Sequence, residues 1–182
     1  RRITGKDFLA RAIQGVKAAV LAELTPVKIN VVVLKSVNES EVRDLIDFSS
    51  QTHAILQLIE LVSKDERTDF YREYHYDLGA IENELRREAV RIIDRVINRR
   101  KKYVLPNGSE VEVVKPMHNT DFCSNCHRIR VTSDGQLKPC LMRDDNLIDI
   151  TTPMRHGASD AALVALMKKP ILPREPYYRV LF

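Results

Sequence analysis

Three cysteines are the residues best suited to chemistry in this chain, and all of them lie between positions 123 and 140. Cys123 and Cys126 form a Cys-x-x-Cys pair, which lets two thiolates reach one metal centre from neighbouring backbone positions. Cys140 follows across a predicted hairpin over Ile129–Leu137 that turns at Asp134–Gly135. The spacing therefore predicts a metal centre with three thiolate ligands.

The residues leave three interpretations of this centre open. His127 or His118 could complete a tetrahedral zinc site with the three cysteines. A cubane iron–sulfur cluster held by three cysteines would keep one iron open for a substrate, since such clusters are ordinarily held by four. Free or redox-active thiols are the third interpretation. A count of 3 cysteines excludes a disulfide framework and favours a reduced, cytoplasmic protein.

Two arginines follow the second cysteine with a spacing of two. In a strand, Arg128 and Arg130 would point to one face beside the metal centre. A guanidinium group binds phosphate or a base edge through paired hydrogen bonds. The pair is therefore either ordinary surface charge or part of a ligand site.

Helices and strands alternate in the first part of the chain and must position these groups. The apolar spacing predicts helices over Phe8–Glu23 and after a capping box at Asn38–Glu41, and strands over Val27–Leu34 and Ala54–Val62. This rhythm is typical of α/β folds with parallel strands, whose ligands lie at the carboxyl ends of the strands. Polar residues interrupt both strands, and they are Lys28, Asn30, Gln57 and Glu60.

The residue pattern of the remaining segments changes near Lys102. A loop over residues 63–78 is followed by one long helix, Ala80–Arg100, whose basic end suits the helix dipole or an anion. A hairpin over Tyr103–Val114 and a short helix over Ser159–Lys168 are predicted beyond it. We therefore expect two domains, residues 1–102 and 103–182.

Composition excludes several classes of protein. The 182 residues are 44% hydrophobic and 30% charged, which is ordinary for a globular chain and unlike disordered or low-complexity sequences. No apolar stretch approaches the roughly 20 residues of a membrane span. The net charge of +4 is compatible with a phosphate-bearing partner without requiring one. The start at Arg1–Arg2, without an initiator methionine, suggests a piece of a longer protein.

The segment Phe122–Leu141 closely resembles the C-terminal cluster motif of the MoaA family, the GTP 3′,8-cyclases of molybdenum cofactor biosynthesis. That family pattern is Phe-Cys-x-x-Cys-x-Arg-x-Arg, a Thr/Ser-x-Asp-Gly turn, and a third cysteine before leucine. The stretches Gly15–Ala19, Val27–Val33 and Leu58–Glu60 are similar to late barrel strands and helices of the same radical S-adenosylmethionine (SAM) enzymes.

The resemblance implies an α/β fold that is part of an incomplete, TIM-like (βα) barrel. Residues 1–102 would supply its late βα units, and residues 103–182 an α+β extension that carries an iron–sulfur cluster. The N-terminal half of the family holds a second [4Fe-4S] cluster that cleaves SAM. The resulting radical takes hydrogen from GTP, which cyclises to 3′,8-cyclo-7,8-dihydro-GTP.

The resemblance also implies roles for particular residues. Cys123, Cys126 and Cys140 would hold a [4Fe-4S] cluster whose open iron binds guanine. Lys28, Arg128 and Arg130 would contact GTP, with Lys28 on the triphosphate. Asn30 and Val62 would contact SAM.

The chain departs from the family in three respects. It contains no Cys-x-x-x-Cys-x-x-Cys motif, so the missing N-terminal half would be needed for radical generation. Gln57 stands where many members have arginine, and Val62 where methionine is frequent. The terminal Gly-Gly is replaced by the ending Tyr178–Phe182. The implied partners are GTP, the N-terminal half, a second copy in a homodimer, and pyranopterin monophosphate synthase in the pathway.

Two other classes of function remain open from the residues themselves. The basic stretch at Arg99–Lys102 and the arginine pair would suit a zinc- or cluster-bearing module that binds nucleic acid without catalysis. Few aromatic residues accompany that basic stretch, which disfavours nucleic acid. A regulatory domain with a closed zinc site is the other alternative, and no membrane partner is expected.

Overall fold

The computed structural model describes residues 3–169 and 176–178, and the chain separates into two compact units. We call residues 3–95 and 100–115 the sheet unit, and the described residues 96–99 and from 116 onward the cysteine unit. The sequence predicted a division near Lys102. In the structure the hairpin beyond Lys102 belongs to the sheet unit instead, because its second strand pairs with a strand from the first half of the chain.

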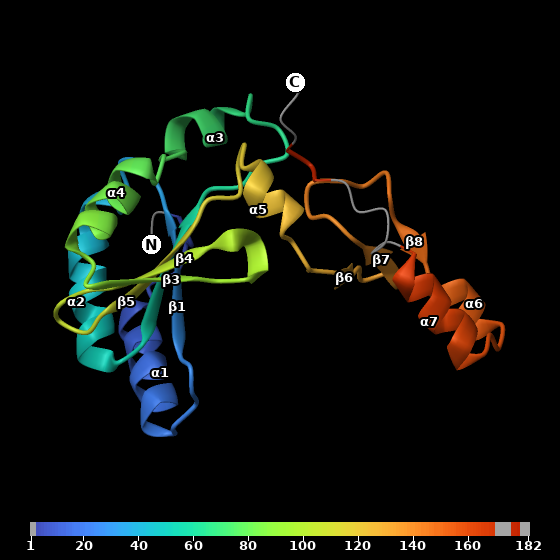
Figure 1. Ribbon diagram of the computed structural model, residues 1–182, viewed down its shortest axis with the longest axis horizontal. Coiled ribbons are helices and arrows are strands. Elements are labelled where there is room, and N and C mark those ends of the chain that lie inside the picture. The colour runs from blue at the N-terminus through green and yellow to red at the C-terminus, as the bar shows by residue number, and fades with distance from the viewer. Residues whose placement is uncertain (1–2, 170–175, 179–182) are drawn as a thin grey trace. The chain divides into compact units, whose positions relative to one another are not determined.

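The sheet unit combines helices with a five-stranded mixed sheet (Figure 1). Its helices are α1 (Leu9–Leu21), a 3₁₀ turn η1 (Glu39–Glu41), α2 (Val42–Thr52), α3 (Asp69–Tyr74) and α4 (Gly79–Glu88). Its strands are β1 (Lys28–Val33), β2 (Ile55–Glu60), β3 (Arg91–Asp94), β4 (Lys101–Val104) and β5 (Glu110–Val114). The α/β class expected from the alternating pattern is confirmed.

The strand order is β1-β2-β5-β4-β3, with β1, β2 and β5 parallel and β3 and β4 antiparallel to their neighbours. In this register Asn30 faces Gln57, Gln57 faces Glu112, and Glu112 faces Lys102. Side chains of paired residues point to the same face of a sheet. These four polar residues therefore form one row across the sheet.

The opposite face of the sheet carries the core. Helices α2 and α4 cover it (Figure 1), and their buried residues Ile46 and Leu85 pack on Leu56 and Leu58 of the central strand β2. Tyr103 is fully buried there, and its hydroxyl donates a hydrogen bond of 2.9 Å to Glu82. The alternation of apolar and polar residues along β1 and β2 thus separates a helix-covered face from a polar face.

The predicted long helix over Ala80–Arg100 is wrong in its second half. Helix α4 ends at Glu88, and the chain then forms strand β3, which pairs with β4. Val90, Ile92 and Ile93 are β-branched and suit an extended chain, although their spacing also fits a helix. The basic residues in the last turn of α4 are Arg86 and Arg87.

Two further expectations differ in detail. The segment predicted as a loop over residues 63–78 contains helix α3, whose N-cap Thr68 accepts a hydrogen bond from the Tyr71 N–H. At the predicted capping box, the Asn38 side chain turns back to the strand instead. It accepts from the Leu34 N–H at 2.7 Å and donates to the Val32 carbonyl at 3.0 Å. The Asn38 side chain thus stabilises the end of β1 rather than the start of the helix.

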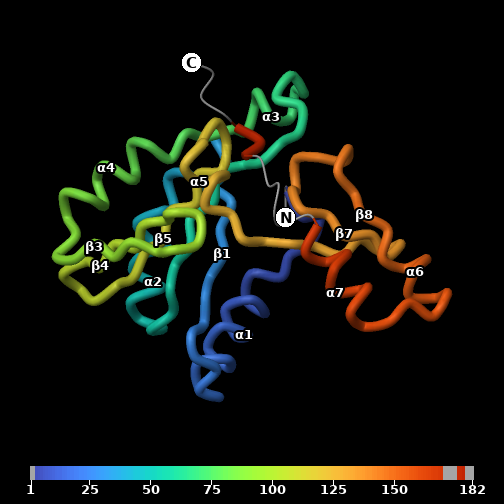
Figure 2. The backbone as a smooth tube through the Cα atoms, turned by 45° about the vertical axis from the view of Figure 1, so that its right-hand side comes forward, coloured from blue at the N-terminus to red at the C-terminus, as the bar shows by residue number. Residues whose placement is uncertain are grey.

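The cysteine unit contains a small antiparallel sheet of order β6-β7-β8 and three helices (Figure 2). The strands are β6 (Arg130–Val131), β7 (Gln136–Lys138) and β8 (Ile148–Asp149). The helices are α5 (Thr120–Ser124), α6 (Thr151–Arg155) and α7 (Asp160–Lys168), together with a 3₁₀ turn η2 (Ile97–Arg99). Both predicted hairpins and the helix capped by Ser159 are confirmed. Among the residues described, no helix is both long and apolar enough for a membrane crossing.

Candidate functional site

A short helix presents the first two cysteines. Helix α5 begins after Asn119, whose side chain accepts a hydrogen bond of 2.9 Å from the Phe122 N–H. Cys123 lies inside this helix. The Cys126 N–H donates a hydrogen bond of 3.2 Å to the Cys123 carbonyl where the helix ends. The Cys-x-x-Cys segment is therefore a helix end, which brings two thiols to neighbouring positions.

The β6–β7 hairpin returns Cys140. Gly135 has a φ of +82°, and the Thr132 N–H donates 2.9 Å to the Gln136 carbonyl to close the turn. A Cβ at position 135 would lie 1.8 Å from the Thr151 hydroxyl, which donates 2.8 Å to the Gly135 carbonyl. Glycine is therefore required here both by the backbone conformation and by the close approach of Thr151.

The three thiols form one electrostatic group. None is in a disulfide, and each is half-buried. Burial is the largest cause that raises the pKa of Cys123, and the thiols of Cys140 and Cys126 raise that pKa further. The backbone N–H groups of Tyr178 and Tyr177 hydrogen-bond Cys123 and lower its pKa in part. Backbone donors directed at a cysteine sulfur are also among the features that tune iron–sulfur clusters.

In the part of the chain that the structure describes, the three cysteines are not arranged around the position of a single metal ion. The described residues contain no group of three or more His, Cys, Asp or Glu side chains gathered around one ion position. Neither His127 nor His118 joins the cysteines in such a group, and His118 instead packs against Tyr178 at 4.7 Å between ring centroids. A cluster of several irons has ligands that stand farther apart than those of one ion.

The two arginines differ in their surroundings. Arg128 is exposed and precedes the hairpin, whereas Arg130 begins β6 and is half-buried opposite Lys138. Lys138 in turn pairs with Asp144. Arg128 therefore lies outside β6, whereas a common face with Arg130 requires both residues in one strand.

Lys28 lies on the polar face of the sheet. Its ammonium donates a hydrogen bond of 2.8 Å to Glu112 Oε1, and its side chain keeps 27% of its surface exposed. Two arginines, Arg95 and Arg100, also reach Glu112, at 4.0 and 3.6 Å. The structure thus gathers three cations around one carboxylate that is completely buried.

The other predicted residues of the sheet unit have separate places. Asn30 is exposed in the polar row beside Gln57, and Val62 follows the end of β2 in a half-buried position. Glu60 points to the helix-covered face, where His75 approaches it at 2.9 Å. Of the ending Tyr178–Phe182, residues 179–182 lie outside the described residues.

Sequence reasoning missed Glu112, Arg95 and Arg100 as a group. No sequence signal was available for Glu112, because it alternates with valine along β5 as Glu110 does, which is the ordinary pattern of a solvent-facing side chain. Arg95 and Arg100 were attributed to a helix end that does not exist. The tight turn between β3 and β4, closed by the Arg95 N–H on the Arg100 carbonyl at 2.8 Å, brings them together.

That turn also supports the cysteine helix. Residues 96–99 belong to the cysteine unit, and Asn98 is 2% exposed with a φ of +60°. Its backbone N–H donates a hydrogen bond of 2.7 Å to the Asn125 carbonyl, and its Nδ2 donates one of 2.9 Å to the Phe122 carbonyl. Asn98 thereby fixes both ends of the segment that carries Cys123.

We expect Asn98→Ala to destabilise the protein by about 1–3 kcal/mol, because a buried carbonyl loses its donor and alanine resists a positive φ. Urea unfolding followed by circular dichroism measures this loss. Val96→Ala is the matched control, since Val96 is 81% exposed in the same turn. Equal unfolding midpoints for the two variants would contradict the supporting role of Asn98.

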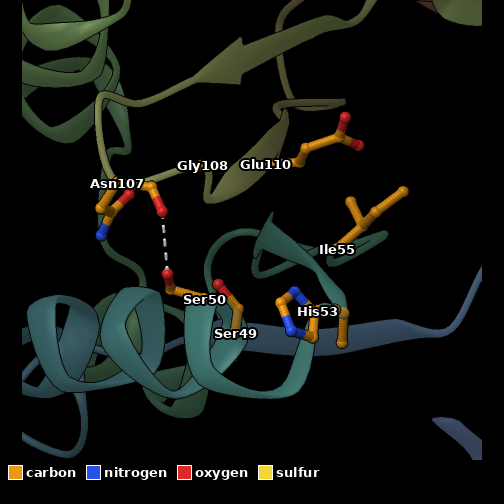
Figure 3. A pocket seen from close by; sticks show the side chains of 8 residues that line it. Ser49, Ser50, His53, Ile55, Asn107, Gly108 and Glu110 are labelled. Carbon is orange, nitrogen blue, oxygen red and sulfur yellow. Dashed lines mark hydrogen bonds between the residues drawn. The ribbon is translucent and has the colours of Figure 1, made fainter.

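Two cavities of the sheet unit lie away from these residues. A cavity of about 390 Å³ opens beside Ile55 and Glu110, the first residues of β2 and β5, where Ser50 donates 3.2 Å to the Asn107 carbonyl (Figure 3). A second cavity of about 350 Å³ shares His53, Ile55 and Glu110 with it. None of the residues predicted to bind ligands lines either cavity. These cavities are at the amino ends of the strands, whereas α/β folds bind ligands at the carboxyl ends.

Comparisons with known proteins agree with the cysteine pattern. The family model described as Molybdenum Cofactor Synthesis C matches residues 54–180. Proteins named probable GTP 3′,8-cyclase are similar to nearly the whole chain: that of Thermococcus kodakarensis is 47% identical over 98% of this chain, and that of Methanothermobacter marburgensis is 48% identical over 98%. The chain spans 60% of the Thermococcus protein and 59% of the Methanothermobacter protein.

Proposed function

Because the chain belongs to the Molybdenum Cofactor Synthesis C family, whose model matches residues 54–180, we propose that it is the substrate-binding C-terminal part of a radical SAM GTP 3′,8-cyclase. The relatives that carry this name cover almost all of the chain. The observation that carries the proposal is the group of three neighbouring thiols in the cysteine unit, none of which is in a disulfide and two of which raise the pKa of the third. The alternative of a nucleic-acid-binding module is not favoured by these relatives.

Cys123, Cys126 and Cys140 hold a [4Fe-4S] cluster in this proposal. When bound, such a cluster on three cysteines supplies an iron with an open coordination position for a purine. The short helix α5 and the β6–β7 hairpin position the three cysteines, and burial raises the pKa of the Cys123 thiol, so binding of metal there would release a proton.

Cationic side chains bind the nucleotide. Arg128 and Arg130 lie within a few residues of the cysteines in the same unit and contact GTP through paired hydrogen bonds. Lys28 offers a compact ammonium to the triphosphate from the polar face of the sheet. Asn30 and Val62 contact SAM, as the family resemblance implies.

The rest of the enzyme completes the sheet. β1 is an edge strand whose described neighbour is β2, and the apolar residues Leu9 and Leu21 of α1 are 70% and 87% exposed. A segment equal to the remaining length of the relatives would continue this sheet into a TIM-like barrel and supply the SAM-cleaving cluster. Cysteines without disulfides suit the reducing cytoplasm. A homodimer and a following pyranopterin monophosphate synthase are further proposed partners.

The activity is tested with the full-length protein, reconstituted with iron and sulfide without oxygen. Addition of GTP, SAM and a reductant is expected to give 3′,8-cyclo-7,8-dihydro-GTP and 5′-deoxyadenosine, both measured by mass spectrometry. A protein that binds zinc, takes up no iron and leaves GTP unchanged would overturn the proposal. Omission of SAM is the control that separates the radical reaction from hydrolysis of GTP.

Arg128→Ala and Arg130→Ala are each expected to weaken GTP binding by about tenfold or more while iron content stays unchanged. The physical reason is the loss of a bidentate guanidinium contact. Isothermal titration with GTP and an iron assay measure the two quantities. Arg155→Ala, in helix α6 of the same unit, is the matched control. Loss of iron together with GTP affinity would show that the arginines support the fold instead.

A further inference from the structure

Glu112 is a fully buried carboxylate in the middle of the sheet unit. It lies in strand β5 with 0% of its surface exposed, between Gln57 on one side and Lys102 on the other. Its Oε1 accepts a hydrogen bond from Lys28, and its Oε2 makes no hydrogen bond to any residue that the structure describes. A carboxylate in this position is costly unless cations offset its charge.

Three cations surround this carboxylate and exceed its charge. Lys28 lies at 2.8 Å, Arg100 at 3.6 Å and Arg95 at 4.0 Å. One negative charge cannot neutralise three positive ones, so the group keeps a formal surplus of positive charge. A surplus held at a partly buried position attracts anions more strongly than isolated surface lysines do.

The cations are arranged so that part of the group reaches solvent. The Lys28 and Arg95 side chains keep 27% and 42% of their surface exposed, whereas Arg100 keeps 8%. Lys28 comes from β1 and Arg95 from the turn after β3, so the two heads approach the buried carboxylate from opposite edges of the sheet. Glu112 thus lies beneath a cationic surface with two accessible heads.

We propose that Glu112 is a positioning residue, which holds the Lys28 ammonium and the Arg95 guanidinium in place so that they bind the polyphosphate chain of a nucleotide. This inference rests on the proposed function for the identity of the nucleotide. Arg95 becomes a phosphate-binding residue, and the buried Arg100 adds positive charge beside the carboxylate. The hydrogen bond to Lys28 restricts a long side chain that would otherwise sample many rotamers.

A positioning role and a purely electrostatic role of Glu112 predict opposite changes in anion affinity when the carboxylate is removed. If Glu112 acted only through its charge, its removal would strengthen anion binding, because one negative charge near the phosphates would disappear. If Glu112 positions the cations, its removal weakens anion binding despite that change. Glu112→Gln keeps the size of the side chain and separates the two cases.

The experiment titrates the full-length protein with inorganic triphosphate and with GTP. Glu112→Gln is expected to weaken both by about tenfold or more, with an unchanged circular dichroism spectrum. Glu110→Gln is the matched control, because Glu110 lies on the same strand and face and pairs with Lys102 at 2.6 Å. That variant is expected to bind triphosphate as the unmodified protein does.

A double-mutant cycle tests the action through Lys28, and an Arg95→Met variant serves if Glu112→Gln is poorly folded. Glu112→Gln lowers triphosphate affinity in the unmodified protein and in a Lys28→Met background. The loss is expected to be smaller in the Lys28→Met background, by at least about threefold. Arg95→Met alone is expected to weaken triphosphate binding and to reduce its salt dependence.

The outcomes separate this inference from the proposed function. GTP binding that is unchanged or tighter in Glu112→Gln overturns the positioning role and leaves the proposed function standing. Triphosphate binding that weakens in the variant, in a protein that makes no cyclised product, supports the positioning role while the cyclase proposal fails. An unmodified protein that binds neither triphosphate nor GTP overturns both.

Discussion

Replacement of Cys140 by alanine is expected to remove about half of the iron from the reconstituted full-length protein, since one of two equal clusters would lose a ligand. Cys126→Ala should have the same effect. The loss follows from the position of Cys140 at the end of the hairpin that turns at Gly135, where the hairpin provides no second thiol to replace it. Iron content, acid-labile sulfide and the visible spectrum measure the result.

The matched control is Ser124→Ala. Ser124 lies between the first two cysteines and is exposed, so its removal should leave iron content unchanged. Full iron content in both cysteine variants would contradict a cluster held by these residues. One zinc per chain, lost in the same variants, would instead support the closed zinc site that the sequence left open.

The largest expected effect on folding comes from Leu58→Ala. Leu58 is 0% exposed in β2, the strand that pairs with both β1 and β5, and it packs under the helices of the sheet unit. Removal of its buried methyl groups leaves a cavity and should lower the free energy of unfolding by about 2–5 kcal/mol. Urea unfolding of the full-length protein at neutral pH measures the shift.

Val32→Ala provides the comparison for this prediction. Val32 lies in the neighbouring strand β1 but is 41% exposed, so its truncation should cost less than about 1 kcal/mol. An equal shift in the two variants would show that β2 does not form the centre of the core. The same result would also question the row of polar residues on the other face of the sheet, because that row depends on the register of β2.

Local patterns were sufficient where the cause of the structure is local. The turn at Asp134–Gly135 was predictable because only glycine adopts its backbone conformation without strain. The strands Lys28–Val33 and Ile55–Glu60 were predictable because β-branched and apolar residues dominate both runs. The candidate site residues of the cysteine unit also rest on a local pattern, since their spacing lies within one short segment, and their roles stay a prediction.

The segment after Glu88 shows where this reasoning fails. Its apolar residues satisfy a helical spacing and a strand alternation equally, and the pairing of β3 with β4 decided between them. The same error concealed the relation between Arg95 and Arg100, which a helix would have placed on different turns. Glu112 alternates with valines in β5 as Glu110 does, so the sequence does not distinguish it from a solvent-facing carboxylate.

The sequence by itself determined the chemistry that the cysteines offer and the alternating α/β architecture, because both depend on residues close together in the chain. Only the tertiary structure decided that Lys28, Arg95 and Arg100 meet at Glu112. Lys28 and Glu112 are 84 residues apart in sequence, and parallel pairing of β1, β2 and β5 brings them to 2.8 Å. Strand order and register are set by the burial of a whole sheet face, and no local pattern contains that information.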